Sequence, residues 1–247
     1  MVLNRLYFGN FFRLDLCIKN NQEQWIPESK ITLNDFDDLI VYIIIGIIAG
    51  GRLGYIFFYN FNYYINDIVE IFKLWNGGMS FHGGLAGVIF ATYIFTKIKK
   101  KKFFPFTDVI CCVAPIGIFF GRLANFINGE LVGKESSLPW AVVFSEHGNF
   151  ARHPSQIYEA ILEGVVLFII INFLALKKDL LFKSGIISGI FLILYSVLRI
   201  ISEFFRVPDD HIGYIYSYLS MGIILSIFTL CFGLIIVFKV SKNEQNY

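Results

Sequence analysis

Residues 108–133 read Asp-Val-Ile-Cys-Cys-Val-Ala-Pro-Ile-Gly-Ile-Phe-Phe-Gly-Arg-Leu-Ala-Asn-Phe-Ile-Asn-Gly-Glu-Leu-Val-Gly, and this stretch decides the class of fold. It opens with a predominantly apolar run of about 20 residues, the length an α-helix needs to cross the hydrocarbon core of a bilayer. The run ends in polar residues, placed where a membrane helix meets its loop: Arg122, Asn125, Asn128 and Glu130. A charge at mid-bilayer costs roughly 2.5–3.5 kcal/mol on insertion scales, so these residues are candidates for a functional site.

The composition agrees with a membrane protein. The 247 residues are 56% hydrophobic and only 16% charged, whereas soluble domains are about 25% charged. Mean hydropathy is +0.63. Several stretches, the quoted one included, approach the length of a membrane span: 39–58, 79–95, 108–127, 157–176, 185–204 and 215–238. We therefore predict an all-α polytopic membrane protein with about six transmembrane helices and a broken or re-entrant segment.

Lysine and arginine residues indicate which loops face the cytoplasm, because cytoplasmic loops carry an excess of them. They gather in the N-terminal segment, in residues 97–102, in residues 177–183 and after Phe238. Both termini are therefore predicted to be cytoplasmic. The basic run at 97–102 fits a topology anchor, with binding of acidic lipid headgroups as the alternative. Basic residues spread over the loops of a membrane bundle argue against a nucleic-acid partner.

The pattern divides the chain into three parts. Residues 1–38 form a predicted cytoplasmic or interfacial segment, residues 39–238 a transmembrane domain, and residues 239–247 a cytoplasmic tail. The connection 128–152 is predicted to be a small non-cytoplasmic head above the bundle.

Two local signals refine this division. The sequence Thr-Leu-Asn-Asp at 32–35 is typical of a capped helix start and is expected to lead into the first span. Within the head, residues 138–144 fit a short strand, although their alternation is poor.

Neither a disulfide framework nor a metal site is predicted. The four cysteines form no C-x-x-C pair, and no histidine or cysteine cluster has the spacing of metal ligands. Cys111, Cys112 and Cys231 lie in apolar runs. Packing is their expected role, because a buried thiol is inert unless its surroundings lower its pKa.

Glycines surround an arginine in the stretch Gly-Gly-Arg-Leu-Gly-Tyr at 50–55. Glycines in membrane helices allow close helix packing, and this role is more frequent than ligand contact. Several roles are open to Arg52: its side chain extends to the membrane interface, or it pairs with a carboxylate or a lipid phosphate. The residues alone leave these alternatives open.

A second glycine-rich stretch, residues 77–84, reads Gly-Gly-Met-Ser-Phe-His-Gly-Gly. Glycine costs about 1 kcal/mol relative to alanine in a helix interior, so the pattern favours a broken or re-entrant segment. His82 is the best candidate for a proton acceptor, because the ordinary pKa of histidine is about 6.5. A purely structural histidine is the alternative.

Residues 152–159 read Arg-His-Pro-Ser-Gln-Ile-Tyr-Glu and begin the fourth predicted span. Gln156 and Glu159 lie at i and i+3 and share a helix face, and Glu163 follows one turn beyond Glu159. Tyr158 adds a phenol hydroxyl. These groups are able to bind a substrate, or to join a network of salt bridges that fixes the bundle.

The fifth predicted span and the residues just after it place four polar residues on one helix face: Tyr195, Arg199, Glu203 and Arg206. Arg199 and Glu203 have the i, i+4 spacing of an intrahelical ion pair. Arginine presents a planar, permanently charged fork that matches a phosphate. A cavity lined by arginines with one histidine nearby therefore favours a phospholipid headgroup over an ion path.

Five motifs, in order, resemble those of the prolipoprotein diacylglyceryl transferases. They are Gly-Gly-Arg-Leu-Gly-Tyr, the His-Gly-Gly-Leu element within 77–85, the stretch 121–133, the Arg-His-Pro-Ser-Gln-Ile-Tyr-Glu segment, and Glu-Phe-Phe-Arg-Val-Pro-Asp at 203–209. The resemblance covers about residues 39–238.

The resemblance implies a bacterial inner-membrane enzyme without a metal or organic cofactor. It would move a diacylglyceryl group from phosphatidylglycerol to the lipobox cysteine of a prolipoprotein signal peptide, forming a thioether and releasing glycerol phosphate. The residues that the resemblance marks as catalytic are His82 as the base, with Arg122, Glu203 and Arg206. The expected substrate-binding residues are Arg52, Asn125, Asn128, Glu130, Gln156, Tyr158, Glu159, Tyr195 and Arg199.

One feature departs from the family pattern. Members usually begin with an additional span that carries a functional tyrosine, and no such span is predicted before Leu39. A phospholipid-binding member without turnover is therefore an alternative to an active transferase. A small transporter is a further alternative, which the lack of internal repeats disfavours.

Overall fold

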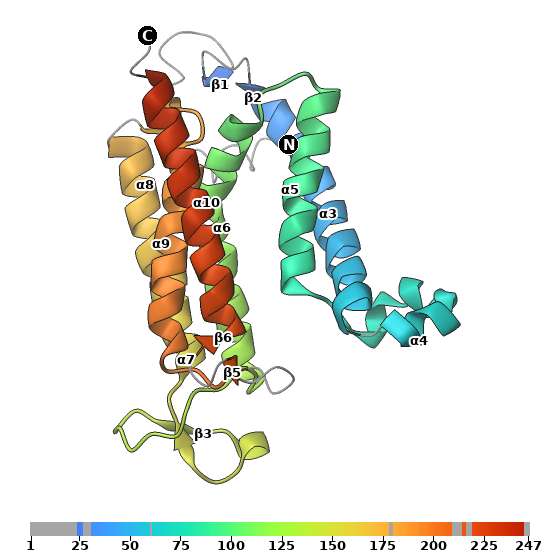
Figure 1. Ribbon diagram of the computed structural model, residues 1–247, viewed down its shortest axis with the longest axis vertical. Helices are drawn as coiled ribbons and strands as arrows, with labels where there is room; N and C mark the ends of the chain where they lie inside the picture. Colours follow the sequence, from blue (N-terminus) through green and yellow to red (C-terminus); the bar gives the residue numbers. More distant parts are fainter. Residues whose placement is uncertain are drawn as a thin grey trace, which may run out of the picture. The chain divides into compact units, whose positions relative to one another are not determined.

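The computed structural model describes residues 24–26, 31–59, 61–177, 180–208, 214–215 and 219–244. Regular structure in these ranges is mainly helical (Figure 1). The longest helices are α3 (Leu33–Tyr59), α5 (Phe81–Ile98), α6 (Phe103–Ile127), α9 (Ile186–Glu203) and α10 (Met221–Glu244). One further helix is assembled from α7 (Ser155–Glu159), the π-helical segment η5 (Ala160–Val166) and α8 (Leu167–Lys177). Most of the predicted N-terminal segment 1–38 lies outside the described residues.

The remaining elements are short. Helical turns are α4 (Phe61–Asn66), η2 (Ile68–Phe72), η3 (Leu74–Asn76), η4 (Ser145–His147) and η6 (Leu180–Phe182). Antiparallel strand pairs in the described ranges are β1 (Gln24–Ile26) with β2 (Ile31–Thr32), β3 (Val142–Val143) with β4 (Ala151–Arg152), and β5 (Tyr214–Ile215) with β6 (Leu219–Ser220).

The prediction of a polytopic, all-helical membrane protein is confirmed. Five helices in the described ranges are long and apolar enough to cross a membrane: Asn34–Phe57, Phe103–Ile127, Ser155–Leu176, Ile186–Glu203 and Met221–Lys242. The second predicted span corresponds to a shorter apolar helix, Gly83–Ile98. These helices expose many isoleucine and phenylalanine side chains, as expected for surfaces that face lipid.

Two predicted boundaries need correction. The broken segment expected at 77–84 is non-helical only as far as Ser80, because α5 is continuous from Phe81 and includes residues 82–84. The last span was predicted to begin at Ile215, but that residue belongs to β5 and α10 begins at Met221. In both places an apolar sequence continues through a turn, so hydropathy alone does not locate the helix start.

The described chain separates into two compact units, residues 1–106 and residues 107–247. In the first unit α3 and α5 pack as an antiparallel pair (Figure 1). A Cβ added at Gly87 would lie 2.0 Å from the carbonyl oxygen of Gly46, and one added at Gly83 would lie 2.3 Å from that of Gly50. The glycines therefore let the two backbones touch, and the predicted packing role of Gly50 is confirmed.

The Gly87→Ala substitution is expected to separate α3 from α5 and to lower the free energy of unfolding by about 1–3 kcal/mol, the usual cost of overpacking. Gly84→Ala is the matched control in the same helix, because an added Cβ there meets its nearest neighbour at 3.8 Å. Thermal unfolding in detergent measures both variants. Equal stability of the two would contradict the close backbone contact.

The N-terminus of α3 is capped as the sequence predicts. The Asp35 carboxylate accepts hydrogen bonds from the Thr32 backbone N–H at 2.8 Å and from the Thr32 hydroxyl at 2.9 Å. Lys101 pairs with the same carboxylate at 3.0 Å, and Lys99 pairs with Asp38 at 2.5 Å. Two lysines of the basic run 97–102 thus tie the end of α5 to the first turns of α3.

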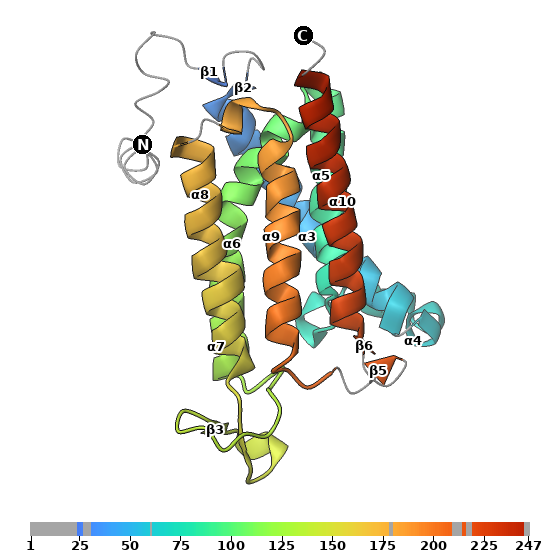
Figure 2. The ribbon, with the colours of Figure 1, turned by 60° about the vertical axis from the view of Figure 1, so that its left-hand side comes forward.

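The second unit contains α6, the α7–η5–α8 helix, α9 and α10 running alongside one another (Figure 2). Asp108 in α6 caps the start of α9 from outside that helix. Its carboxylate accepts hydrogen bonds from the backbone N–H groups of Gly185 at 2.6 Å and Ser188 at 2.7 Å, and from the Ser188 hydroxyl. These bonds satisfy donors that a helix start leaves unpaired.

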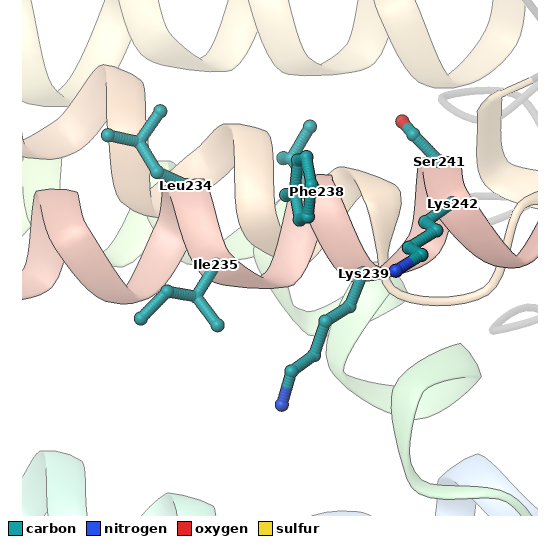
Figure 3. A pocket seen from close by; sticks show the side chains of 7 residues that line it. Leu234, Ile235, Phe238, Lys239, Ser241 and Lys242 are labelled. Atoms are coloured by element: carbon teal, nitrogen blue, oxygen red, sulfur yellow. The ribbon is translucent and has the colours of Figure 1, made fainter.

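A shallow pocket lies along the last turns of α10 (Figure 3). Its apolar part is made by Leu234, Ile235, Val237 and Phe238, and Lys239 and Lys242 follow at the end of the helix. Lysines that end an apolar helix typically extend their charges toward the membrane surface while their stems cover apolar atoms.

The predicted head, residues 128–152, is a loop region that carries η4 and the β3–β4 pair (Figure 1). The short strand expected at 138–144 is reduced to Val142–Val143. Trp140 and Phe150 are exposed there, at 57% and 65% of their surface.

Candidate functional site

Six charged side chains meet inside the second unit and form what we term the ion-pair cluster. Its members come from α6, from α7 and η5, from the end of α9 and from the turn that follows α9: Arg122, Glu159, Glu163, Arg199, Glu203 and Arg206. Five of them are buried, whereas 16% of the Arg122 side chain is exposed. Ionisable groups inside membrane helices are rare and mark a functional site by default.

Arg199 lies at the centre of the ion-pair cluster and contacts all three carboxylates. Its Nη1 lies 2.5 Å from Glu159 Oε1 and 3.4 Å from Glu163 Oε1. Its Nη2 lies 2.6 Å from Glu203 Oε2, one helical turn away. The ion pair predicted from the i, i+4 spacing of Arg199 and Glu203 is therefore confirmed, and Arg199 also bridges α9 to the α7–η5 helix.

Arg122 approaches the same carboxylates from α6. Its Nε lies 3.0 Å from Glu159 Oε2, and its Nη2 lies 3.3 Å from Glu163 Oε2. Glu159 Oε2 accepts no hydrogen bond from a described residue, so its contact with Arg122 is an ion pair without hydrogen-bond geometry. Within the described residues, Nη2 of Arg122 donates to Glu163 Oε2 and Nη1 donates no hydrogen bond.

The π-helical segment positions the two central carboxylates. Glu159 ends α7 and Glu163 lies within η5, and π-helical turns are frequent at functional sites. A Cβ added at Gly164 would lie 2.7 Å from the Cβ of Phe119, so this glycine lets η5 approach α6. The close approach brings Arg122, three residues after Phe119, within reach of Glu163.

The charges of the ion-pair cluster balance. Three arginines face three glutamates, so the cluster is neutral when all six groups are ionised. Burial of a charge is tolerated when it is paired and hydrogen-bonded, and removal of one partner leaves an uncompensated charge. Ser202 adds a further bond, because its hydroxyl donates to Glu163 Oε1 at 3.1 Å.

The stretch Asn-Phe-Ile-Asn-Gly-Glu at 125–130 ends α6 with a Schellman motif. Gly129 has a φ of +68°, its N–H donates to the Phe126 carbonyl, and the Glu130 N–H donates to the Asn125 carbonyl at 2.9 Å. The Asn125 side chain also donates to Glu130 Oε2 at 2.8 Å, and that of Asn128 lies 3.5 Å from Glu130 Oε1. Three predicted site residues are therefore brought together just beyond the helix end.

Backbone pairing fixes Arg206 beneath the head. Residue Gly133 forms an antiparallel bridge with Arg206, and the Lys134 N–H donates to the Phe205 carbonyl at 2.9 Å. The Gly133 N–H donates to the His153 carbonyl, and a Cβ at Gly133 would lie 2.3 Å from that oxygen. Arg206 Nη1 then lies 3.7 Å from Glu159 Oε1. Gly133, which closes the quoted motif, is thus needed where three chain segments meet.

Gln156 and Tyr158 connect the α7 start to its surroundings. The buried Gln156 amide donates to the Glu130 carbonyl at 2.6 Å, and its Oε1 accepts no hydrogen bond from a described residue. The Tyr158 hydroxyl accepts a bond from Trp140 Nε1 at 2.8 Å and lies 3.2 Å from His153 Nδ1. Tyr158 is therefore tied to the head, whereas Gln156 offers an unpaired buried acceptor.

The first unit contains two predicted site residues, His82 and Arg52. His82 is the second residue of α5, and its side chain lies outside what the structure describes. Arg52 is buried in α3, and all its N–H groups face backbone carbonyl oxygens of the first unit. Binding of a substrate by Arg52 would require that some of these bonds break.

The structure brings most predicted residues of the second unit together and adds two. Tyr195 stacks on Phe191, with ring centroids 6.0 Å apart, and lies one turn before Arg199. Neither Glu163 nor Ser202 was among the catalytic or substrate-binding residues that the resemblance implied; Glu163 is a member of the ion-pair cluster, and Ser202 donates to it. The spacing of Glu163, one turn beyond Glu159, was the signal that pointed to it; Ser202 had no such signal.

Comparison with known proteins gives consistent matches along the chain. A family model described as "Prolipoprotein diacylglyceryl transferase" matches residues 8–239. A phosphatidylglycerol–prolipoprotein diacylglyceryl transferase of Rickettsia bellii is 49% identical over 211 residues, which are 85% of this chain and 80% of the relative. The enzymes of the same name from Rhodopseudomonas palustris and Aeromonas salmonicida are 46% and 45% identical, over 91% and 89% of this chain and 79% and 78% of theirs.

Proposed function

The chain belongs to the prolipoprotein diacylglyceryl transferase family, and we propose that it transfers the diacylglyceryl group of phosphatidylglycerol to the lipobox cysteine of prolipoprotein signal peptides. The observation that carries this proposal is a buried, charge-balanced cluster of arginines and glutamates in a membrane-spanning unit, with one arginine partly exposed. Such a site suits an anionic lipid headgroup, because arginine forks match phosphate oxygens.

The reaction is a displacement at carbon. The cysteine sulfur forms a C–S bond with the diacylglyceryl carbon while the C–O bond to the phosphate breaks, and glycerol phosphate leaves with the electron pair. The thiol proton passes to His82, which acts as general base, because a free thiol with a pKa of about 8.5 is mostly protonated at neutral pH. The nucleophile belongs to the substrate, and the reaction as written needs neither a metal ion nor an organic cofactor.

Arg122 and Arg206 hold the phosphate and stabilise the charge of the leaving group. Three observations support Arg122 in this role: its partial exposure, its ion pair with Glu159 without a hydrogen bond, and its Nη1 group, which donates no hydrogen bond to a described residue. Glu159, Arg199 and Glu203 keep the arginines oriented through the ion-pair cluster.

The polar residues at the end of α6 and the start of α7 line the headgroup site. Gln156 Oε1 accepts a hydrogen bond from a glycerol hydroxyl of the lipid. Among the described residues this buried oxygen has no donor, and an unpaired buried acceptor costs about 1–3 kcal/mol. The other residues that we assign to substrate binding are Asn125, Asn128, Glu130, Tyr158 and Tyr195; Arg52 is not among them, because its five N–H donors already bond backbone carbonyls.

The protein is a multi-pass membrane protein, and we assign it to the bacterial inner membrane with both termini in the cytoplasm. The distribution of lysine and arginine supports this orientation, since the basic run 97–102 and the lysines after Phe238 would lie on the cytoplasmic side. The head at 128–152 then faces the periplasm, where it meets the prolipoprotein above the catalytic domain.

The proposal is tested by incubating the purified chain in detergent with phosphatidylglycerol labelled in its diacylglyceryl group and a lipobox peptide. We expect labelled thioether on the peptide, and none on a matched peptide whose cysteine is replaced by serine. Absence of product together with retained binding of phosphatidylglycerol would overturn the transfer activity and identify a member that binds phospholipid without turnover.

The Arg122→Lys substitution is expected to lower kcat/KM by about 10²–10³-fold, the usual loss when a donor to a developing anion is removed. Lysine retains the charge but loses the planar fork that contacts Glu159 and Glu163 and faces the phosphate. The transfer assay measures the loss, and thermal unfolding checks that the variant is folded. Near-normal turnover would show that Arg122 has a structural role alone.

A further inference from the structure

Every N–H donor of the Arg52 guanidinium is hydrogen-bonded to a backbone carbonyl of the same chain. Its Nε donates to the Ile71 carbonyl at 3.0 Å, and its Nη2 donates to the carbonyls of Glu70 at 2.5 Å and Lys73 at 3.0 Å. Its Nη1 donates to the carbonyls of Gly77 and Gly78. An arginine has five N–H donors, so each one has a carbonyl partner. The guanidinium also lies 5.0 Å from the ring centre of Tyr64.

These carbonyls belong to a stretch that lacks a regular helix. Residues 67–80 contain only the short turns η2 and η3, in which few carbonyl oxygens accept a backbone hydrogen bond; that of Glu70 does, from the Lys73 N–H at 3.2 Å. A buried carbonyl without a donor costs about 1–3 kcal/mol. Arg52 supplies donors to five carbonyls of this stretch from a single side chain, so it holds residues 70–78 against α3.

The clamped stretch leads directly into α5. Gly78 has a φ of +83°, and a Cβ there would lie 2.6 Å from the Tyr55 ring and 3.0 Å from Arg52 Nη1. The Ser80 N–H donates to the Gly51 carbonyl at 2.8 Å. The Ser80 hydroxyl then caps α5 by accepting a bond from the Gly83 N–H at 3.2 Å.

We propose that Arg52 is a positioning residue for the transfer reaction: by clamping residues 70–78 it fixes the start of α5 and so the backbone of His82. His82 is the second residue of α5, two positions after Ser80. Arg52 therefore acts through the link between α3 and α5 and not through the substrate. The kinetic part of this inference rests on the proposed role of His82 as the base.

Two substitutions loosen the clamp from opposite sides. Arg52→Gln removes most of the donors, and Gly78→Ala places a methyl group against Tyr55 and Arg52. Gly77→Ala is the matched control for the second, because Gly77 also has a positive φ, +78°, but has no atom within 4 Å of an added Cβ. Arg152→Gln is the control for the first, since Arg152 donates to the carbonyls of Gly133 and His147 in the head.

The first readout is the imidazole NMR signal of His82 in the full chain labelled at its histidine rings, assigned by its absence from His82→Ala. We expect the signal to shift or broaden in Arg52→Gln and Gly78→Ala. It should stay in place in Gly77→Ala. Arg152→Gln should perturb the His147 signal and leave that of His82 unchanged. The second readout is kcat, which we expect to fall on the order of a hundredfold with little change in KM for phosphatidylglycerol.

The readouts separate the clamp from the proposed function. In one outcome, the unmodified chain shows no transfer activity and the His82 signal still responds as expected. That result would support the clamp and contradict the proposed function. If transfer is normal and Gly78→Ala behaves like Gly77→Ala in both readouts, the clamp is overturned. The comparison of Gly78→Ala with Gly77→Ala tests the clamp even where Arg52→Gln does not fold.

Discussion

The Arg199→Met variant should lose about 3–5 kcal/mol of unfolding free energy, the cost of removing one partner from a buried ion pair. Methionine keeps a flexible, unbranched side chain but has no charge, so Glu159, Glu163 and Glu203 would lose their shared cation. For a chain of this size the loss corresponds to a fall in Tm of about 10 °C, which thermal unfolding in detergent measures. Transfer activity should disappear with the ordered cluster.

Arg152→Met is the matched control. Its partner Glu135 is 59% exposed and lies 3.6 Å away, so this ion pair contributes at most about 1 kcal/mol. Adding Glu163→Gln to Arg199→Met restores charge balance and should recover part of the lost stability, which a double-mutant cycle quantifies. Equal Tm values for Arg199→Met and Arg152→Met would contradict the proposed contribution of Arg199 to stability at the centre of the ion-pair cluster.

Local sequence spacing predicted the parts of the site that lie on one helix. The pairing of Arg199 with Glu203 follows from an i, i+4 spacing, and the capping of α3 by Asp35 follows from its position after Thr32. The packing role of Gly50 also followed from the preference of membrane helices for small residues at contacts.

Local spacing did not predict the contacts between helices. That Arg122 meets Glu163 depends on the approach of η5 to α6 at Gly164, and the π-helical turns leave no periodic signal in an apolar run. The carbonyl partners of Arg52 lie about 20 residues away in chain that hydropathy assigned to no element. The sequence left the role of Arg52 open because backbone acceptors have no side-chain signature.

Loss of the base should be the most damaging change to the chemistry. We expect His82→Ala to abolish transfer at neutral pH while binding of phosphatidylglycerol survives, because the ion-pair cluster that we assign to the phosphate does not include His82. His147→Ala is the matched control: this histidine is exposed in the head and contacts the Gly129 carbonyl at 3.0 Å. Binding and transfer are measured on the same preparations.

The pH dependence identifies what His82 does. If His82 removes the thiol proton, the alanine variant depends on thiolate formed by the solvent, and its residual rate should rise about tenfold per pH unit below the thiol pKa of about 8.5. Histidine, with an ordinary pKa of about 6.5, makes the unmodified enzyme less dependent on pH above neutrality. Added imidazole should restore part of the rate at neutral pH. Full activity of His82→Ala would remove this residue from the mechanism. A loss of activity that neither higher pH nor imidazole relieves would assign His82 to binding or folding, because the variant would then be defective in something other than proton removal.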